Sequence, residues 1–195
     1  QLQKFLLEKS GGSWELVIEE RATFHDIDEN ATAHFKELSL KRFPIAAKEK
    51  SISNLLEKLG LLNNKKLTRA AVLLFCKEPQ KFYTNSRIRI GRFKDDATLL
   101  GEDEITGNLF QQVEGTMEIL KKKYLHSEVA FEGLNRKEEL EYPEEALREA
   151  IVNAVVHRDY SSTNTQFRVY PDQISIWNNG ELFGLTIDDL KKKHK

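Results

Sequence analysis

Three polar side chains able to do chemistry recur at a fixed interval in one segment of the sequence. Glu149, Asn153 and His157 lie four residues apart within "PEEALREAIVNAVVHRDY". A helix turns through about 100° per residue, so positions four apart form one stripe along its surface. A carboxylate can act as a general base, and an amide oxygen is a ligand that suits a hard cation such as Mg²⁺. The stripe is therefore the first candidate functional site.

The helix that must carry this stripe is otherwise apolar. Val152 and Val156 fall on nearly the opposite side from a stripe of core-facing positions, which are Leu147, Ala150, Ile151, Ala154 and Val155. We therefore expect a helix that is buried on two sides. A buried polar group left unsatisfied costs about 1–3 kcal/mol. The polar stripe must then be paired within the protein or line a cavity, and helix physics alone favours internal pairing.

The loop after this helix carries further polar groups. His157 and Asp159 could be read as a pair of metal ligands, but two ligands in one loop are weak evidence for a metal. We expect His157 instead to close the helix and to bond a nearby backbone group or carboxylate. Arg158 and Tyr160 are expected to pack this loop beside the candidate site rather than to perform chemistry.

A predicted β-hairpin follows the loop. "QFRVY" and "QISIW" both alternate apolar and polar residues, and Pro171-Asp172 supplies the turn between them. The second strand runs into Asn178, Asn179 and Gly180. A glycine at such a turn lets the backbone approach another group closely. The end of this strand is thus a second candidate for ligand contact.

Helices and strands interleave along the rest of the chain. We predict helices within residues 26–43, 51–62 and 108–125, with Asp28 and Ser51 as N-caps. "AVLLF" suits a buried strand after a short helix capped by Thr68, and residues 127–142 suit a hairpin. "SRIRIGRF" reads as a strand whose basic face is formed by Arg87, Arg89 and Arg92. The fold class predicted is α+β, with a mixed sheet and packed helices.

Composition and charge limit the classes of protein. The 195 residues are 39% hydrophobic and 31% charged, which suits a soluble globular chain of one domain or two small ones. The net charge of −1 provides no overall basic field for nucleic acid or anionic lipid. A lone Cys76 excludes an internal disulfide and favours a reducing cytoplasm. No apolar run approaches the ~20 residues of a membrane span, so no membrane partner is expected.

The elements from helix to Asn-Asn-Gly resemble a known family. "EYPEEALREAIVNAVVHRDYS" and "ISIWNNGELFGLTIDDL" resemble the carboxyl-terminal ATPase-like module of bacterial transcriptional regulators described as RecG-like. Three upstream segments also match the family's usual order: "LGLLNNKKLTRAAVLLFCKEPQKFY", "RIRIGRFK" and "EGTMEILKKKY". The resemblance covers most of the chain, from about Asp26 onward.

The resemblance also implies a division of the chain. Family members carry a schlafen/AlbA-type DNA-binding domain ahead of this module. The sequence begins with Gln1 and its single methionine is Met117, so we expect a piece of a longer protein with that domain upstream. Residues 1–45 are then a connecting helical segment, 46–140 an α/β middle region, and 141–195 the first half of the ATPase-like module. Residues 46–195 could equally form one compact domain.

The module is similar to the GHKL (Bergerat-fold) ATPases of gyrase and histidine-kinase type, here in truncated form. This similarity implies ATP and Mg²⁺ as cofactors. In the motif Glu-x-x-x-Asn of the first helix, Glu149 matches the general base that activates water, and Asn153 matches the Mg²⁺ ligand. In the motif Asp-x-Gly-x-Gly, Asn178 stands where an Asp accepts from the adenine amino group. Gly180 matches the first glycine of that motif, and Leu182 replaces the second.

These departures from the family pattern weaken the implied ATP site. Asn178 can accept through its amide oxygen, but a neutral amide makes a weaker bond than a carboxylate. Leu182 places a side chain where the nucleotide needs room. The glycine-rich lid over the phosphates is expected beyond Lys195. We add His157 to the candidate cofactor contacts, because it closes the same helical stripe.

Three functions from different classes are therefore open. The first is a module of a transcriptional regulator that senses a ligand or serves assembly without catalysis. The second is a Mg²⁺-dependent ATP hydrolase in the full-length protein, with Glu149 as the general base. The third is direct DNA binding by this piece, for which the net charge gives little support. DNA binding through the upstream domain and homodimer formation are the partner relationships that the resemblance implies.

Overall fold

A four-stranded mixed sheet with helices packed against it forms the centre of the molecule, as the predicted α+β class requires. The computed structural model describes residues 13–132, 135–160 and 162–179. In this part of the chain, no helix is long and apolar enough to cross a membrane.

The helices and strands follow one another in the order that the sequence predicts for most of the chain. In chain order they are η1 (Trp14–Leu16), η2 (Phe24–Asp26), α2 (Glu29–Ser39), α3 (Pro44–Ala47), α4 (Ile52–Lys58), β1 (Leu62–Asn63), β2 (Lys66–Leu67), α5 (Arg69–Phe75), η3 (Pro79–Lys81), β3 (Ile88–Phe93), β4 (Leu99–Ile105), α6 (Leu109–Ile119), a π-helical turn η4 (Leu120–Tyr124), β5 (Ser127–Glu132), β6 (Asn135–Leu140), α7 (Glu144–Val156), β7 (Thr165–Val169) and β8 (Ile174–Trp177).

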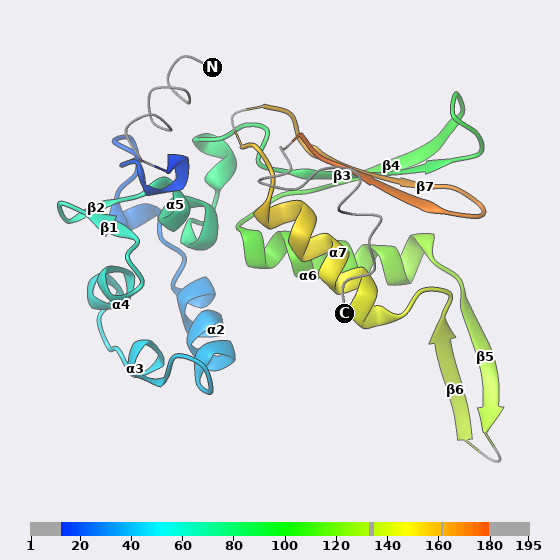
Figure 1. Cartoon of the computed structure of the whole chain (residues 1–195), viewed down its shortest axis with the longest axis horizontal. Coiled ribbons are helices and arrows are strands. Elements are labelled where there is room, and N and C mark those ends of the chain that lie inside the picture. Colours follow the sequence, from blue (N-terminus) through cyan, green and yellow to red (C-terminus); the bar gives the residue numbers. More distant parts are fainter. Residues whose placement is uncertain (1–12, 133–134, 161, 180–195) are drawn as a thin grey trace, which may run out of the picture.

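The sheet has the strand order β4-β3-β7-β8. β3 pairs antiparallel with β4 and parallel with β7, whereas β7 and β8 form an antiparallel hairpin. Helices α6 and α7 lie on one face of the sheet, and the β5–β6 hairpin extends away from it (Figure 1). The buried residues between the helices and the sheet include Ile90, Phe167, Met117 and Ile151. This arrangement, residues 88–177, is called the sheet lobe below.

A second apolar core holds the amino-terminal helices together. It includes Leu56, Val72 and Phe75 and belongs to residues 14–83, called the helical lobe below. Leu109 of α6 packs against both cores, so the two lobes meet at the start of α6. Tyr160, from the loop after α7, packs against the core of the helical lobe.

The N-caps of the helical lobe confirm the local sequence predictions. The Asp28 side chain accepts from the Asn30 N–H at 2.9 Å, and the Ser51 hydroxyl accepts from Asn54 at 3.5 Å. Gly60 ends α4 with φ of +69°, a backbone conformation that favours glycine. Thr68 caps α5 by accepting from the Ala71 N–H at 3.3 Å.

Two local predictions in the helical lobe are wrong. "AVLLF" is not a strand but most of α5, because the Thr68 cap starts a helix that is buried by its neighbours on several sides. In a short apolar run, the pattern alone does not distinguish a buried helix from a buried strand. The helix that was expected to run to Pro44 ends at Ser39, and Pro44 instead opens the separate helix α3.

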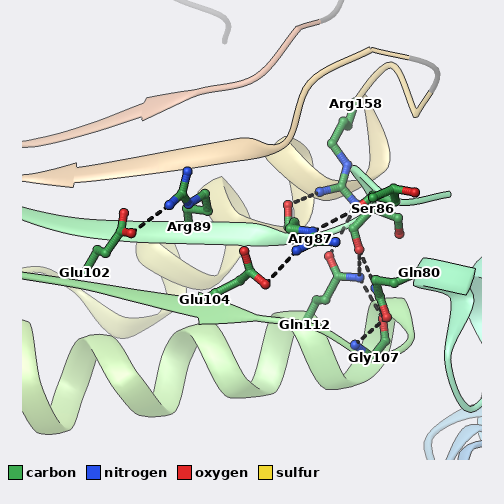
Figure 2. Close-up of polar contacts among 10 residues, drawn as sticks. Gln80, Ser86, Arg87, Arg89, Glu102, Glu104, Gly107, Gln112 and Arg158 are labelled. Carbon is green, nitrogen blue, oxygen red and sulfur yellow. Dashed lines mark hydrogen bonds and ion pairs between the residues drawn. The ribbon is translucent and has the colours of Figure 1, made fainter.

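The predicted basic face of β3 is also wrong. Arg87 and Arg89 are paired with Glu104 and Glu102 of β4, at 2.8 and 2.6 Å (Figure 2). Arg92 lies on the opposite side of the strand, where it donates to the Lys123 carbonyl and covers the Tyr124 ring at 5.2 Å. Strand side chains alternate, so Arg92 shares its side with Ile88 and Ile90. The three arginines therefore do not form one basic surface for DNA.

Glu19 is a buried carboxylate of the helical lobe, with 7% of its surface exposed. It accepts from Arg21 Nε and from the Tyr83 hydroxyl, each at 2.8 Å. Burial raises the pKa of Glu19, but the hydrogen bonds from Arg21 and Tyr83 outweigh burial and hold the pKa below its ordinary value. Since the pKa of Glu19 is lower in the folded state than in the unfolded state, the ionised carboxylate stabilises the fold. This stabilisation is complete above the unfolded-state pKa. It is lost as the pH falls through the folded-state pKa.

Substituting Glu19→Gln is expected to reduce the free energy of unfolding by about 1–3 kcal/mol at neutral pH. The difference in stability between wild type and variant should shrink as the pH falls below about 4, because the wild-type carboxyl is then protonated and neutral, like the glutamine side chain. Urea denaturation across this pH range measures both effects. Glu20→Gln is the control, since Glu20 is exposed and forms a surface ion pair with Lys66. An equal response of both variants to pH would contradict the role of Glu19.

Candidate functional site

Helix α7 positions the polar stripe that the sequence predicts. Pro143 precedes the helix, and Glu144 and Glu145 occupy the first turn, where negative charge suits the helix dipole. Its buried residues are Leu147, Ile151, Ala154 and Val155, which confirms most of the predicted core-facing positions. The apolar side of α7 is thereby fixed against α6 and the sheet.

The stripe itself, Glu149, Asn153 and His157, is exposed to solvent. The prediction that α7 is buried on two sides is therefore wrong: Val156 is 59% exposed, and Val152 is half-buried. The reason is that α6 and the sheet cover only one side of the helix. The prediction that the stripe is satisfied by pairing in the interior does not hold either, because its side chains do not lie in the interior.

Glu149 and Asn153 contact each other on the surface of α7. The Asn153 Nδ2 group donates to Glu149 Oε1 at 3.0 Å. This bond uses neither the amide oxygen of Asn153 nor the second carboxylate oxygen of Glu149, and both residues are exposed. Oxygen atoms of this kind fit a Mg²⁺ ion that keeps several waters and receives its other ligands from phosphates. The pair suits the chemistry that the family resemblance implies.

The end of β8 docks on the carboxyl-terminal end of α7. Asn178 Nδ2 donates to the His157 carbonyl at 3.5 Å, and the Asp159 N–H donates to the Asn179 carbonyl at 2.7 Å. Asn179 Nδ2 also donates to the Ser162 hydroxyl at 2.6 Å. The structure thus brings the first residue of the Asn-Asn-Gly segment beside the last residue of the stripe. Gly180 lies outside the described residues.

These contacts assign specific roles to two predicted site residues. His157 is the C-cap of α7, and its N–H donates to the Asn153 carbonyl at 3.0 Å, which agrees with the expectation that His157 closes the helix. The described bond of Asn178 uses its amide nitrogen, so its amide oxygen is the atom that can accept from a ligand. From Glu149 to His157 the stripe extends over about 12 Å of helix.

Arg158 and Tyr160 pack the loop between α7 and β7, as the sequence analysis expected, through partners that the sequence did not identify. Arg158 is only 5% exposed, and burial lowers the pKa of its guanidinium. Burial also raises the pKa of Tyr160, whose hydroxyl donates to the Val155 carbonyl at 2.6 Å. An arginine inside a polar loop is ordinarily a surface residue, so the sequence did not indicate how deeply Arg158 is buried or which groups it contacts.

Metal chemistry based on protein ligands alone finds no support in the described ranges. Among residues 13–132, 135–160 and 162–179, no group of three or more His, Cys, Asp or Glu residues could hold a metal ion. The pairing of His157 with Asp159 as metal ligands thus gains no third ligand. A Mg²⁺ ion at Asn153 is a different case, because it would depend on nucleotide phosphates for further ligands.

The comparisons with known proteins support the fold. No family model matches the sequence, and no curated protein matches it. The structure is similar to the crystal structure of the DIP2311 protein from Corynebacterium diphtheriae, a structural genomics target, with a TM-score of 0.64 and 20% sequence identity. The match covers 92% of this chain and 36% of that protein, so this chain spans about a third of its length. At this level of identity the likeness concerns the fold alone.

Proposed function

We propose that this chain belongs to a cytoplasmic bacterial transcriptional regulator and forms an ATPase-like module that senses an adenine nucleotide without hydrolysing it. The observation that carries the proposal is the exposed Glu149–Asn153 pair on the same helical stripe as His157, with Asn178 docked at the end of that stripe. Chemical groups suited to a metal-bound phosphate and to an adenine amino group thus lie on one helical stripe and at its end. DNA binding belongs to a domain upstream of this module, and the assembled regulator is a homodimer.

The residues have separate roles in this proposal. Asn153 contributes its amide oxygen to a Mg²⁺ ion held by the nucleotide phosphates, and Asn178 accepts from the adenine amino group. When bound, Mg²⁺·ATP would supply the phosphate ligands that this surface lacks. Phosphoryl transfer depends on electrostatic clamping of the phosphates. Asn178 and Leu182 replace family residues that contact the nucleotide, which favours detection of the nucleotide over its turnover.

Isothermal titration of the chain with Mg²⁺·ATP tests the proposal. We expect saturable binding that Asn153→Ala weakens about tenfold, the scale of one lost interaction with a charged partner. Asn178→Asp should strengthen binding by about three- to tenfold, because a carboxylate accepts from the amino group more strongly than an amide. A chelator in excess removes Mg²⁺ and with it the contact to Asn153. Under this condition the wild type should bind ATP with about the affinity of Asn153→Ala.

The matched control for this titration is Asn63→Ala. Asn63 is an exposed asparagine of β1, in the helical lobe, and this substitution should leave the affinity unchanged. Failure to observe saturable binding, or equal binding by the Asn153 and Asn63 variants, would exclude the nucleotide-sensing role.

A second candidate function is ATP hydrolysis, which the exposed carboxylate of Glu149 favours. A carboxylate one helical turn from the proposed Mg²⁺ ligand can reach a water molecule near the metal. Phosphate release by the full-length protein separates the two functions. Hydrolysis predicts turnover that Glu149→Gln abolishes while Mg²⁺·ATP binding remains, whereas sensing predicts binding with no turnover in either protein.

A further inference from the structure

The Arg158 guanidinium is a buried junction between elements that are distant in the sequence. It donates to the Arg87 carbonyl at 2.8 Å and to the hydroxyl of Thr165, the first residue of β7, at 3.3 Å. Its other terminal nitrogen donates to Gln112 Oε1 of α6 at 3.3 Å. Figure 2 shows the guanidinium directed into this set of groups. One side chain of the loop after α7 is thus attached to the sheet and to α6 at once.

The acceptors of Arg158 belong to a larger buried network. Gln112 donates to the carbonyls of Ser86 and Gly107, at 3.0 and 2.8 Å. Gln80, at the end of the helical lobe, donates to the same two carbonyls and accepts from the Gly107 N–H at 3.0 Å. The acceptors that fix the position of the Arg158 guanidinium are thus themselves part of a hydrogen-bonded network (Figure 2).

Tyr160 attaches the same loop to the helical lobe. The Arg158 guanidinium lies over the Tyr160 ring at 4.4 Å, and this ring stacks on Trp14 at 6.0 Å with an interplanar angle of 12°. Arg69 of α5 covers the Trp14 ring at 4.8 Å. The Tyr160 hydroxyl donates a hydrogen bond to the carbonyl of Val155, near the end of α7, where carbonyls lack a partner within the helix. The two side chains of Arg158 and Tyr160 together connect α7, the sheet and the helical lobe.

The exposed side chains of the candidate site depend on the backbone of α7 and of the following loop for their positions. Glu149, Asn153 and His157 are exposed, so packing of their own side chains does not hold them. The backbone of the loop makes the contact to the end of β8, through the Asp159 N–H and the Asn179 carbonyl. Arg158 is next to Asp159 in the chain and is the buried, hydrogen-bonded anchor of this loop. Arg158 thus contributes to the position of Asn178 relative to the stripe, together with the bonds of Asn178 to His157 and of Asn179 to Ser162.

From these contacts we infer that Arg158 and Tyr160 are positioning residues, which hold the loop after α7 so that Asn178 stays beside the Glu149–Asn153–His157 stripe. As far as it concerns a nucleotide, this inference rests on the proposed function. The loop position itself can be measured without any ligand, so the two ideas can fail separately.

Amide hydrogen exchange at Asp159 is the measurement that needs no ligand. Arg158→Met and Tyr160→Leu are expected to accelerate exchange at Asp159 about tenfold or more, while the amides of β3 and β7 keep their protection. Tyr160→Phe retains the ring stack and removes only the hydroxyl, which donates to the Val155 carbonyl, so it should have a smaller effect. Arg168→Met is the matched control, since Arg168 is an exposed arginine of β7 that covers the Phe93 ring at 5.6 Å.

Titration of the same variants with Mg²⁺·ATP then measures how a displaced loop changes the affinity of the site for the nucleotide. We expect Arg158→Met to weaken binding about tenfold and Arg158→Lys, which keeps the charge and part of the hydrogen bonding, to recover part of it. If Arg158→Met does not fold, Arg158→Lys and Tyr160→Phe decide by the same two measurements.

The outcomes separate the two ideas. Unchanged Asp159 exchange in the folded variants overturns the positioning role. Faster exchange with unchanged affinity also overturns it, because the loop would then be structural only. If the wild type does not bind Mg²⁺·ATP, the proposed function fails, and the exchange result alone decides whether Arg158 and Tyr160 position the loop.

Discussion

Replacing Phe167 with alanine is expected to lower the free energy of unfolding by about 3–5 kcal/mol. Phe167 lies at the centre of the sheet, paired in register with Ile90 of β3 and Ile176 of β8. Its side chain is 1% exposed and packs in the core between the sheet and the two helices. Both neighbouring strands and α7 depend on this core, so the cavity cannot be filled by a small shift of one element.

Chemical denaturation of the two proteins at 25 °C measures this loss. Trp177→Ala is the control in the same hairpin, because Trp177 is a large aromatic residue that is 47% exposed. We expect the control to lose about 1 kcal/mol or less. Comparable losses in both variants would mean that the core does not lie on the face of the sheet that the structure assigns to it.

The local elements of this fold could be predicted from the sequence because their signals are local. Asp28, Ser51 and Thr68 are capping residues, and each accepts the hydrogen bond expected of an N-cap. The β7–β8 hairpin followed from alternation and from Pro171-Asp172 between its strands. These features involve residues a few positions apart, and their energetics hardly depend on the rest of the chain.

The pairing of the strands could not be predicted in the same way. β4 was not expected, since three of the seven residues in "LLGEDEI" are acidic and its side chains are largely exposed on an edge strand. The parallel pairing of β3 with β7 joins Ile90 to Phe167, and such contacts have no local signature. The error at Arg92 is of a different kind, because strict alternation along β3 already places Arg92 on the side of Ile88 and Ile90.

The candidate site was predictable in its composition but not in its surroundings. Helical spacing places Glu149, Asn153 and His157 in one stripe, and the structure retains that spacing. Exposure of the stripe depends on which sides of α7 are covered, and this is decided by α6 and the sheet. The sequence connected Asn178 to the stripe only through a family resemblance, whereas the structure shows a contact between Asn178 and the His157 carbonyl.

Gln112 shows most clearly how a buried polar residue supports both the fold and the candidate site. Gln112→Leu should lower the free energy of unfolding by about 2–4 kcal/mol. Its side chain is fully buried, donates to two carbonyls and accepts from Arg158. Gln80 donates to the same two carbonyls, so they keep a partner in the variant. The main cost therefore arises at Arg158, a buried charge that loses one of its three acceptors.

A second substitution at this position separates the acceptor role from the donor role. Gln112→Glu restores an acceptor for Arg158 but no longer donates to Ser86 and Gly107. If Arg158 dominates the cost, Gln112→Glu is less destabilising than Gln112→Leu at neutral pH in chemical denaturation. Gln173→Leu, at an exposed position in the β7–β8 turn, is the control for adding a leucine.

A double-mutant cycle between Gln112→Leu and Arg158→Met completes this argument. Because the two side chains share a hydrogen bond in a buried network, their losses should be non-additive, with a coupling energy of about 0.5–3 kcal/mol. Additive losses would mean that the bond between Gln112 and Arg158 contributes nothing. The loop after α7 would then be held by its other contacts, which include those of Tyr160, of Thr165 and of the Arg87 carbonyl.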